Sequence, residues 1–123
     1  MPEKSITSFK DLQFAPLGEG NPVEAALLWG DPGSGPSAFL IRMPQGYSEP
    51  WHSHTSTYRA VLLQGQFQSR GKDAATDFAE VYEPGAYAVQ PGGQVHSEVN
   101  TSDGPLLAVV FFEGPADFIP AKG

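Results

Sequence analysis

Two histidines one residue apart, His52 and His54, are the first side chains along this sequence that could support metal chemistry. Alternate residues of a β-strand share a face, so both imidazoles would point the same way and could bind one ion. A third histidine, His96, follows a Pro-Gly-Gly turn and begins another run of strand-forming residues. The 123 residues contain no further histidine and no cysteine, so any metal ion must be bound through nitrogen and oxygen.

The elements that must position these histidines are predicted to be β-strands. Glycine (14 residues) and proline (12 residues) interrupt the chain too often for long helices, and short runs of β-forming residues lie between them. Many short strands at regular spacing are typical of an all-β sandwich or barrel. The predicted strands cover residues 25–29, 37–42, 52–63, 66–69, 78–82, 86–89, 95–99 and 106–112.

Charge and hydropathy argue against several classes of function. The net charge is −7 and only seven lysines and arginines are present, so nucleic acid or an anionic membrane would not be attracted electrostatically. No apolar run approaches the roughly 20 residues of a membrane-spanning helix, and the N-terminal residues lack the apolar stretch of a signal peptide. We therefore expect a cytoplasmic protein whose partner is a small-molecule substrate or ligand.

Residues 46–65 and 85–100 resemble the two sequence motifs of the cupin superfamily. Residues that fill the first motif at its spacing are Gly46, His52, His54 and Gly65. Residues that fill the second are Gly85, Pro91, Gly93, His96 and Asn100. The resemblance implies one RmlC-like cupin domain over residues 1–123: an all-β jelly-roll barrel, or double-stranded β-helix, with an N-terminal arm of about residues 1–24. It also implies a metal ion held by His52, His54 and His96.

The sequence departs from the first cupin motif at Tyr58, which occupies the position of a glutamate. Counting in twos from His54 places Tyr58 on the inward face and Arg59 on the outward face. Its phenol, with an ordinary pKa of about 10, is either a barrel-filling aromatic or a catalytic hydroxyl that hydrogen-bonds the substrate. Glu98, two residues after His96, is the best candidate for a catalytic carboxylate that contacts the metal or its ligands.

Three neutral imidazoles leave a divalent ion with its full positive charge, which favours an anionic, chelating substrate. Among cupins this ligand set resembles that of the three-histidine non-haem iron dioxygenases. Fe²⁺ is therefore the first choice of cofactor, although Zn²⁺, Ni²⁺ and Mn²⁺ also occur in such sites. Because coordination requires neutral imidazole, we expect metal affinity to fall as the pH drops below about 6.5.

Two further polar residues are candidates for substrate binding. Arg70 could hold a carboxylate through two hydrogen bonds, and Gln64 could bind a polar group of the substrate. Two other acids are weaker candidates, because Glu49 precedes Pro50 and has the wrong parity, and Glu113 ends a strand. The interior is otherwise expected to be apolar, and the residues available to line it include Phe39, Ile41, Tyr87, Val89 and Phe111.

Three functions are consistent with these residues. The first is a metal-dependent oxidoreductase of the dioxygenase type that acts on a small anionic or chelating organic molecule. The second is a non-catalytic sensor that binds metal or ligand, and the third is a cupin isomerase or lyase that uses a histidine and Tyr58 as base and acid. Residues 27–55 also resemble small bacterial cupins related to the cupin domain of anti-sigma factors, which implies a homodimer paired through its sheets.

Overall fold

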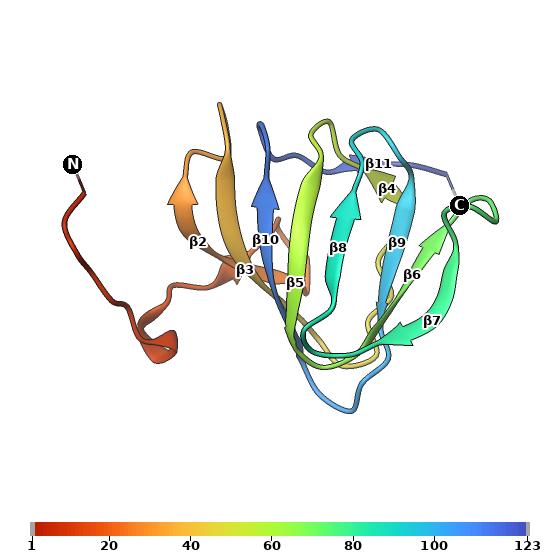
Figure 1. Cartoon of the computed structure of the whole chain (residues 1–123), viewed down its shortest axis with the longest axis horizontal. Helices are drawn as coiled ribbons and strands as arrows, with labels where there is room; N and C mark the ends of the chain where they lie inside the picture. Colours follow the sequence, from red (N-terminus) through yellow and green to blue (C-terminus); the bar gives the residue numbers. More distant parts are fainter. Residues whose placement is uncertain (1, 123) are drawn as a thin grey trace.

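Short apolar runs between glycine and proline turns form two antiparallel β-sheets that face each other (Figure 1). The structure is a computed structural model that describes residues 2–122, so Met1 and Gly123 of the predicted domain lie outside the described residues. One short 3-10 helix, η1 (Phe9–Asp11), precedes the strands. The strands are β1 (Ala15–Pro16), β2 (Glu24–Gly30), β3 (Ser37–Met43), β4 (His52–Ser53), β5 (Tyr58–Gln64), β6 (Phe67–Gly71), β7 (Phe78–Tyr82), β8 (Tyr87–Gln90), β9 (His96–Asn100), β10 (Leu106–Phe112) and β11 (Ile119–Pro120).

The two sheets have the strand orders β1-β2-β3-β10-β5-β8 and β11-β4-β9-β6-β7. Non-sequential neighbours such as β3 and β10 show that the chain crosses repeatedly between the sheets, as it does in a jelly roll. The predicted all-β cupin barrel is therefore confirmed. The histidines come from β4 and β9 of the smaller sheet and from the loop after β4, and His52 pairs directly with His96.

One predicted strand is wrong in its extent. Residues 52–63 form two strands, β4 and β5, which belong to different sheets and are separated by residues 54–57. Tyr58 does point inward, but the cause is not an unbroken alternation of side chains from His54. It points inward because β5 starts there and places alternate residues, Tyr58, Ala60 and Leu62, against the barrel interior.

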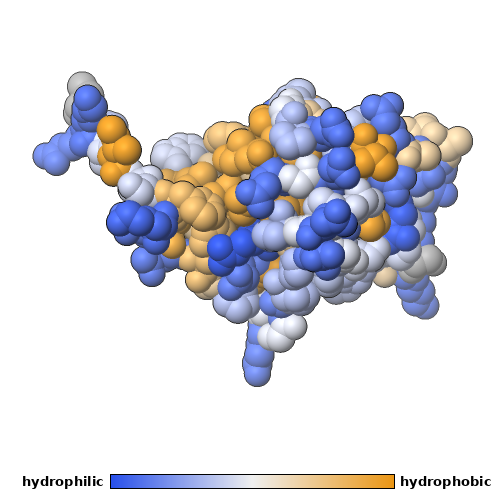
Figure 2. Space-filling view, turned by 90° about the horizontal axis from the view of Figure 1, so that it is seen from below, coloured by the Kyte–Doolittle hydropathy of each residue, from blue (hydrophilic) through white to orange (hydrophobic). Residues whose placement is uncertain are grey.

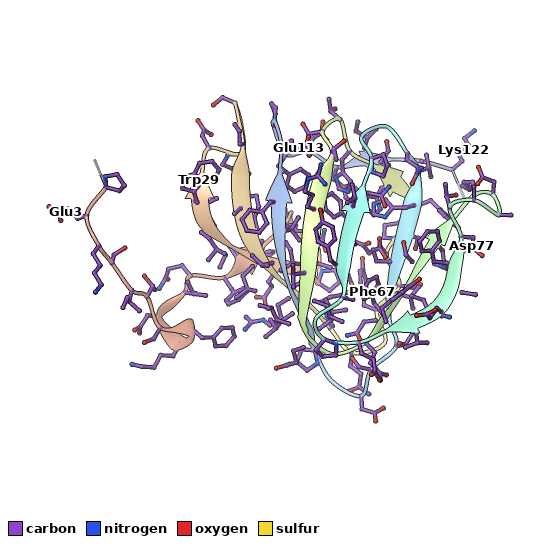
Figure 3. The ribbon with its side chains drawn as sticks, in the orientation of Figure 1. Glu3, Trp29, Phe67, Asp77, Glu113 and Lys122 are labelled. Atoms are coloured by element: carbon purple, nitrogen blue, oxygen red, sulfur yellow. The ribbon has the colours of Figure 1, made fainter. Side chains whose placement is uncertain are left out.

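The apolar interior is formed by alternate residues of the larger sheet packed against the smaller one. Val23, Met43, Leu62 and Leu106 form its buried cluster, and Phe67 of β6 packs against them from the opposite sheet. Figure 3 shows the labelled Phe67 side chain between the two sheets. Phe39 and Ile41 also line the interior, as predicted.

Three of the predicted interior residues lie on the outside of the barrel instead. Tyr87, Val89 and Phe111 are 60%, 46% and 48% exposed, because the neighbouring residues Ala88 and Phe112 occupy the inward positions. The outer face of the larger sheet is consequently rich in exposed apolar side chains. Pairing of two copies through this face stays a prediction.

The N-terminal arm leaves the barrel at one end (Figure 1). It carries exposed apolar side chains, Ile6 and Phe9 among them. It joins the larger sheet through β1, which pairs with β2. Apolar surface gathers on the side of the body from which the arm departs (Figure 2). Within residues 2–122 no helix is long and apolar enough to cross a membrane.

Asn100, the last residue of the second motif, holds together two turns at the base of the barrel. Its side chain is 1% exposed, and Nδ2 donates to the carbonyl oxygens of Met43 (3.2 Å), Pro44 (2.9 Å) and Gly104 (3.0 Å). Its Oδ1 accepts hydrogen bonds from the backbone N–H and the hydroxyl of Ser102. Asparagine supplies both the donors and the acceptor that these turns require.

We expect Asn100→Ala to lower the free energy of unfolding by about 3 kcal/mol, because buried carbonyl groups lose their donor. Chemical denaturation of the metal-free protein measures this change. Thr101→Ala, at an exposed neighbouring position, is the matched control and should change stability by less than about 0.5 kcal/mol. Equal effects of the two substitutions would contradict this role for Asn100.

Candidate metal centre

The three histidines converge inside the barrel. One ring nitrogen from each of His52, His54 and His96 lies within 4.8 Å of the others, and the ring centroids are 4.5 Å to 5.5 Å apart. The side chains are almost wholly withdrawn from solvent, with exposed fractions of 1%, 9% and 2%. Phe118 stacks on the His52 ring at 4.2 Å, so one wall of the cluster is aromatic.

Each histidine is held through the same ring atom, Nδ1. The Nδ1–H of His52 donates to the carbonyl oxygen of Pro50 at 2.7 Å, and that of His54 donates to the carbonyl oxygen of Asp117. His96 Nδ1 lies 2.8 Å from Oε1 of Glu98. Backbone carbonyls only accept, so at least two rings carry their proton on Nδ1 and present the lone pair of Nε2.

The Nε2 atom of His96 is buried and has no hydrogen-bond partner among the described residues. A buried polar atom without a partner destabilises a fold by about 1–3 kcal/mol. Coordination of a cation would remove that penalty, and neutral imidazoles with anchored Nδ1 atoms are the form that binds metals. The three side chains thus fit a divalent ion.

The Pro-Gly-Gly turn of the second motif sets His54 against His96. The N–H of Gly93 donates to the carbonyl oxygen of His54 at 2.7 Å, and the N–H of Gly92 donates to the Thr57 hydroxyl at 3.0 Å. A Cβ atom on Gly92 would collide with the carbonyl oxygen of Thr55. The glycine therefore allows the turn to contact the loop that carries His54.

Burial lowers the pKa of all three histidines. Desolvation is the largest cause and brings the pKa of His52 and that of His96 to about 4, and it lowers the pKa of His54 as well. Protons therefore compete with a metal ion for His52 and His96 only well below pH 6.5. Metal retained at pH 5.5 would not require an additional anionic ligand.

Tyr58 lies beside the cluster, with its ring centroid 5.3 Å from that of His54 and 6.1 Å from that of His96. Burial raises the pKa of its hydroxyl well above the ordinary range, and the charges of Glu98 and Glu49 raise it further. Its hydroxyl is thus a neutral donor at the cavity wall. Tyr58 lines the cavity, and its hydroxyl makes no hydrogen bond among residues 2–122, so it is available to a ligand.

Glu98 lies behind His96 on the same strand face. Besides its contact with His96 Nδ1, Oε1 accepts a hydrogen bond from the Ser69 hydroxyl at 3.1 Å, and Oε2 is buried without a partner in the described part of the chain. Desolvation raises the pKa of this carboxyl to about 7. The geometry places Glu98 as a hydrogen-bond partner that orients the His96 ring.

The alternation of side chains made Glu49 a weaker candidate in the sequence analysis. In the structure Glu49 lies next to Glu98 in the cavity wall. Its Oε1 accepts from the backbone N–H of Glu98 at 3.0 Å, and its own N–H donates to the carbonyl oxygen of Glu98. Desolvation, followed by the charge of Glu98, raises the pKa of Glu49 to about 8. The parity argument failed because Glu49 lies outside the regular strands and is joined to β9 by a single isolated bridge at Ser48.

Asp117 is a second residue that sequence reasoning missed. Its carboxylate accepts hydrogen bonds from the backbone N–H and the hydroxyl of Thr55, and its carbonyl oxygen holds His54. It thereby fixes the loop after β4. No local pattern in the sequence signals this role, because the contact joins residues 62 positions apart.

The two predicted substrate-binding residues do not line the cavity. Arg70 donates to the hydroxyls of Ser97 (2.8 Å) and Ser48 (3.0 Å) on the face of β9 opposite His96. Gln64 is exposed and donates to the carbonyl oxygen of Pro105 at 3.0 Å. Glu113 is also exposed and pairs with Arg59 at 2.9 Å.

A cavity of about 720 Å³ opens beside the histidines, between the inner face of the larger sheet and the smaller sheet. His52, His54, Tyr58, Glu49 and Glu98 lie at its polar end. The remaining wall is mainly apolar and includes Leu27, Phe39, Ile41, Val110 and Phe112. A cavity of this size holds an organic molecule of drug-like dimensions.

Residues 7–116 match the protein family described as a domain of unknown function, DUF4437. The chain belongs to this family. A search of curated proteins found no match to it. The DUF4437 chain also has the cupin fold, because its structural neighbours are cupins despite low sequence identity.

Three solved structures illustrate this likeness. An RmlC-like cupin of Ralstonia eutropha JMP134 is 18% identical with a TM-score of 0.73, over 94% of this chain and 72% of that one. The polyketide cyclase RemF of Streptomyces resistomycificus is 14% identical with a TM-score of 0.77, over 98% and 87%. The complex of Rhodobacter sphaeroides SigE with the anti-sigma ChrR gives 19% identity and a TM-score of 0.65, over 86% and 51%.

The metal-free DUF4437 chain should lose stability as the pH rises from 6.5 to 8. The pKa values of Glu49 and Glu98 are raised by folding, so the stability they contribute is full below about 4.5 and is lost as the pH passes through 7 to 8. The histidines have lowered pKa values and act in the opposite direction, but only between about pH 4 and 6.5. Above pH 6.5 the carboxyl groups alone set the trend.

Denaturation of chelator-treated protein at pH 6.5 and pH 8 should show a fall on the order of 1 kcal/mol, and Glu49→Gln should remove most of it. Glu113→Gln, at an exposed carboxylate, is the control and should keep the fall. A stability that rises over this range, or a fall unaffected by Glu49→Gln, would show that the acids are not buried together.

Proposed function

We propose that this chain is a metal-dependent enzyme of the dioxygenase type that acts on an anionic or chelating organic molecule. The main support for this proposal is the convergence of three imidazoles that are each held through Nδ1. Nε2 of His96 is buried without a partner among the described residues. His52, His54 and His96 would hold a divalent ion, with Fe²⁺ the first choice and Zn²⁺, Ni²⁺ or Mn²⁺ the alternatives. Such an ion supplies Lewis acidity and, as ferrous iron, electrons for the reduction of dioxygen.

Other groups of the protein have distinct roles in the proposed reaction. Glu98 orients His96 through its 2.8 Å contact with Nδ1, and Asp117 orients His54 through its carbonyl oxygen. Tyr58 would donate a hydrogen bond to the oxygen of a bound substrate, since its raised pKa keeps the proton on the phenol. The apolar cavity wall would exclude bulk water from the reacting atoms.

The ligand set supports binding of a chelating anion, which the proposed dioxygenase reaction requires. Among residues 2–122 no carboxylate is placed as a fourth ligand, because Glu98 contacts Nδ1 of His96 and Glu49 contacts Glu98. The centre thus keeps its positive charge and its open positions for a chelating anion. Incorporation of both atoms of dioxygen into the substrate would need no external reductant.

Metal content of protein purified without added metal is the first test. We expect about one divalent ion per chain in the wild type, and at least a tenfold loss in His96→Ala, because one of three ligands is removed. Thr101→Ala, at an exposed position, should keep the ion. Full metal content in folded His96→Ala would refute the proposed site.

Oxygen consumption by the ferrous protein, reconstituted without air and screened with chelating organic acids and enols, tests the reaction. A substrate that triggers uptake in the wild type and not in His96→Ala supports a dioxygenase. Metal binding without uptake would instead favour the sensor function, and turnover by the metal-free protein would favour an isomerase or lyase.

A further inference from the structure

The cavity beside the histidines is chemically one-sided. Its titratable groups gather around His52, His54 and Tyr58, whereas the wall opposite, formed by β2, β3 and β10, carries Leu27, Phe39 and Ile41 and their apolar neighbours. No lysine or arginine among the described residues lines the cavity. A bound anion therefore finds no cationic side chain there, and its charge can be compensated only at the metal centre.

The cavity exists because several inward positions of the larger sheet carry alanine. Ala25, Ala60 and Ala108 occupy inward positions on β2, β5 and β10, where larger side chains would fill the barrel. The resulting cavity of about 720 Å³ opens to solvent, since its lining residues Leu17, Leu27 and Phe118 are 50%, 51% and 42% exposed. Val109, the outward-facing neighbour of Ala108 on β10, does not line the cavity. The cavity therefore lies on the inner face of the larger sheet.

An aromatic wall leads from the metal centre into this space. The ring of Phe112 lies 5.6 Å from that of His54, and the ring of Phe39 meets Phe112 edge-on at 6.4 Å. Flat aromatic surfaces of this kind favour a ligand with an aromatic or otherwise bulky apolar body.

We propose that the substrate is a chelator with a single polar end and a bulky apolar body, of naphthalene size or larger. The polar end faces His52 and His54, and the body lies over Phe39, Ile41 and Ala108. Sugar acids and other ligands that are polar throughout are expected to bind more weakly, because most of their hydroxyls would lie against apolar side chains. The polar end of this substrate is inferred from the proposed function, whereas its apolar body is inferred from the cavity alone.

A series of hydroxamates that share one chelating group tests the proposal. Acetohydroxamate, benzohydroxamate, 2-naphthohydroxamate and gluconohydroxamate are titrated calorimetrically into zinc-loaded protein. Burial of apolar surface strengthens binding by about fourfold per methylene. We expect the naphthyl compound to bind at least about tenfold more tightly than the methyl compound. The gluconyl compound should show no gain.

Substitution of an alanine that lines the cavity distinguishes binding inside the cavity from nonspecific hydrophobic binding. Ala108→Phe should reduce the naphthyl preference to less than about threefold and leave the affinities for zinc and acetohydroxamate unchanged. Val109→Phe, the neighbour that points outward, should keep the preference. Thermal unfolding checks that each variant is folded, and Ala60→Leu serves in place of Ala108→Phe if the latter does not fold.

Zinc-free protein separates this proposal from the proposed function. If zinc does not bind, the metal centre is refuted, but a naphthyl preference that persists without metal and disappears in Ala108→Phe still supports the apolar body. Affinity that is independent of body size, or tight binding of gluconohydroxamate, would overturn the proposal with or without zinc.

Discussion

Burial of three neutral imidazoles around one point is the constraint on which the rest of this structure depends. Each ring loses its hydration, and each recovers one hydrogen bond through Nδ1, to Pro50, Asp117 or Glu98. Nε2 of His96 is left buried without a partner among the described residues. Because the lowered pKa values keep the rings neutral at ordinary pH, the cluster is poised to accept a cation.

The scaffold around this cluster combines rigid polar contacts with an empty apolar space. The Pro-Gly-Gly turn, the Asp117 segment and the Glu49–Glu98 contact each tie a separate stretch of chain to the centre. The inner face of the larger sheet, by contrast, leaves the barrel unfilled. The space that the small side chains of this face leave beside the histidines is open to a ligand from solvent.

The sequence predicted the barrel and the three histidines because short-range rules govern both. Turns rich in glycine and proline delimit the strands. The residue spacings around His52 and His54, and around His96, each lie within one short stretch of chain. The expectation that Tyr87, Val89 and Phe111 line the interior was wrong, because the sequence does not say which face of their strands is inward. Alternation misjudged Glu49, which lies outside the regular strands. Asp117 depends on a long-range contact that no local pattern encodes.

X-ray absorption spectroscopy of the zinc-loaded protein tests the central claim most directly. The account predicts three imidazole nitrogens at about 2.0–2.1 Å from the metal, together with the multiple-scattering signature of histidine rings. A first shell with one imidazole or none, or a shell dominated by carboxylate oxygen, would show that His52, His54 and His96 do not form the metal centre.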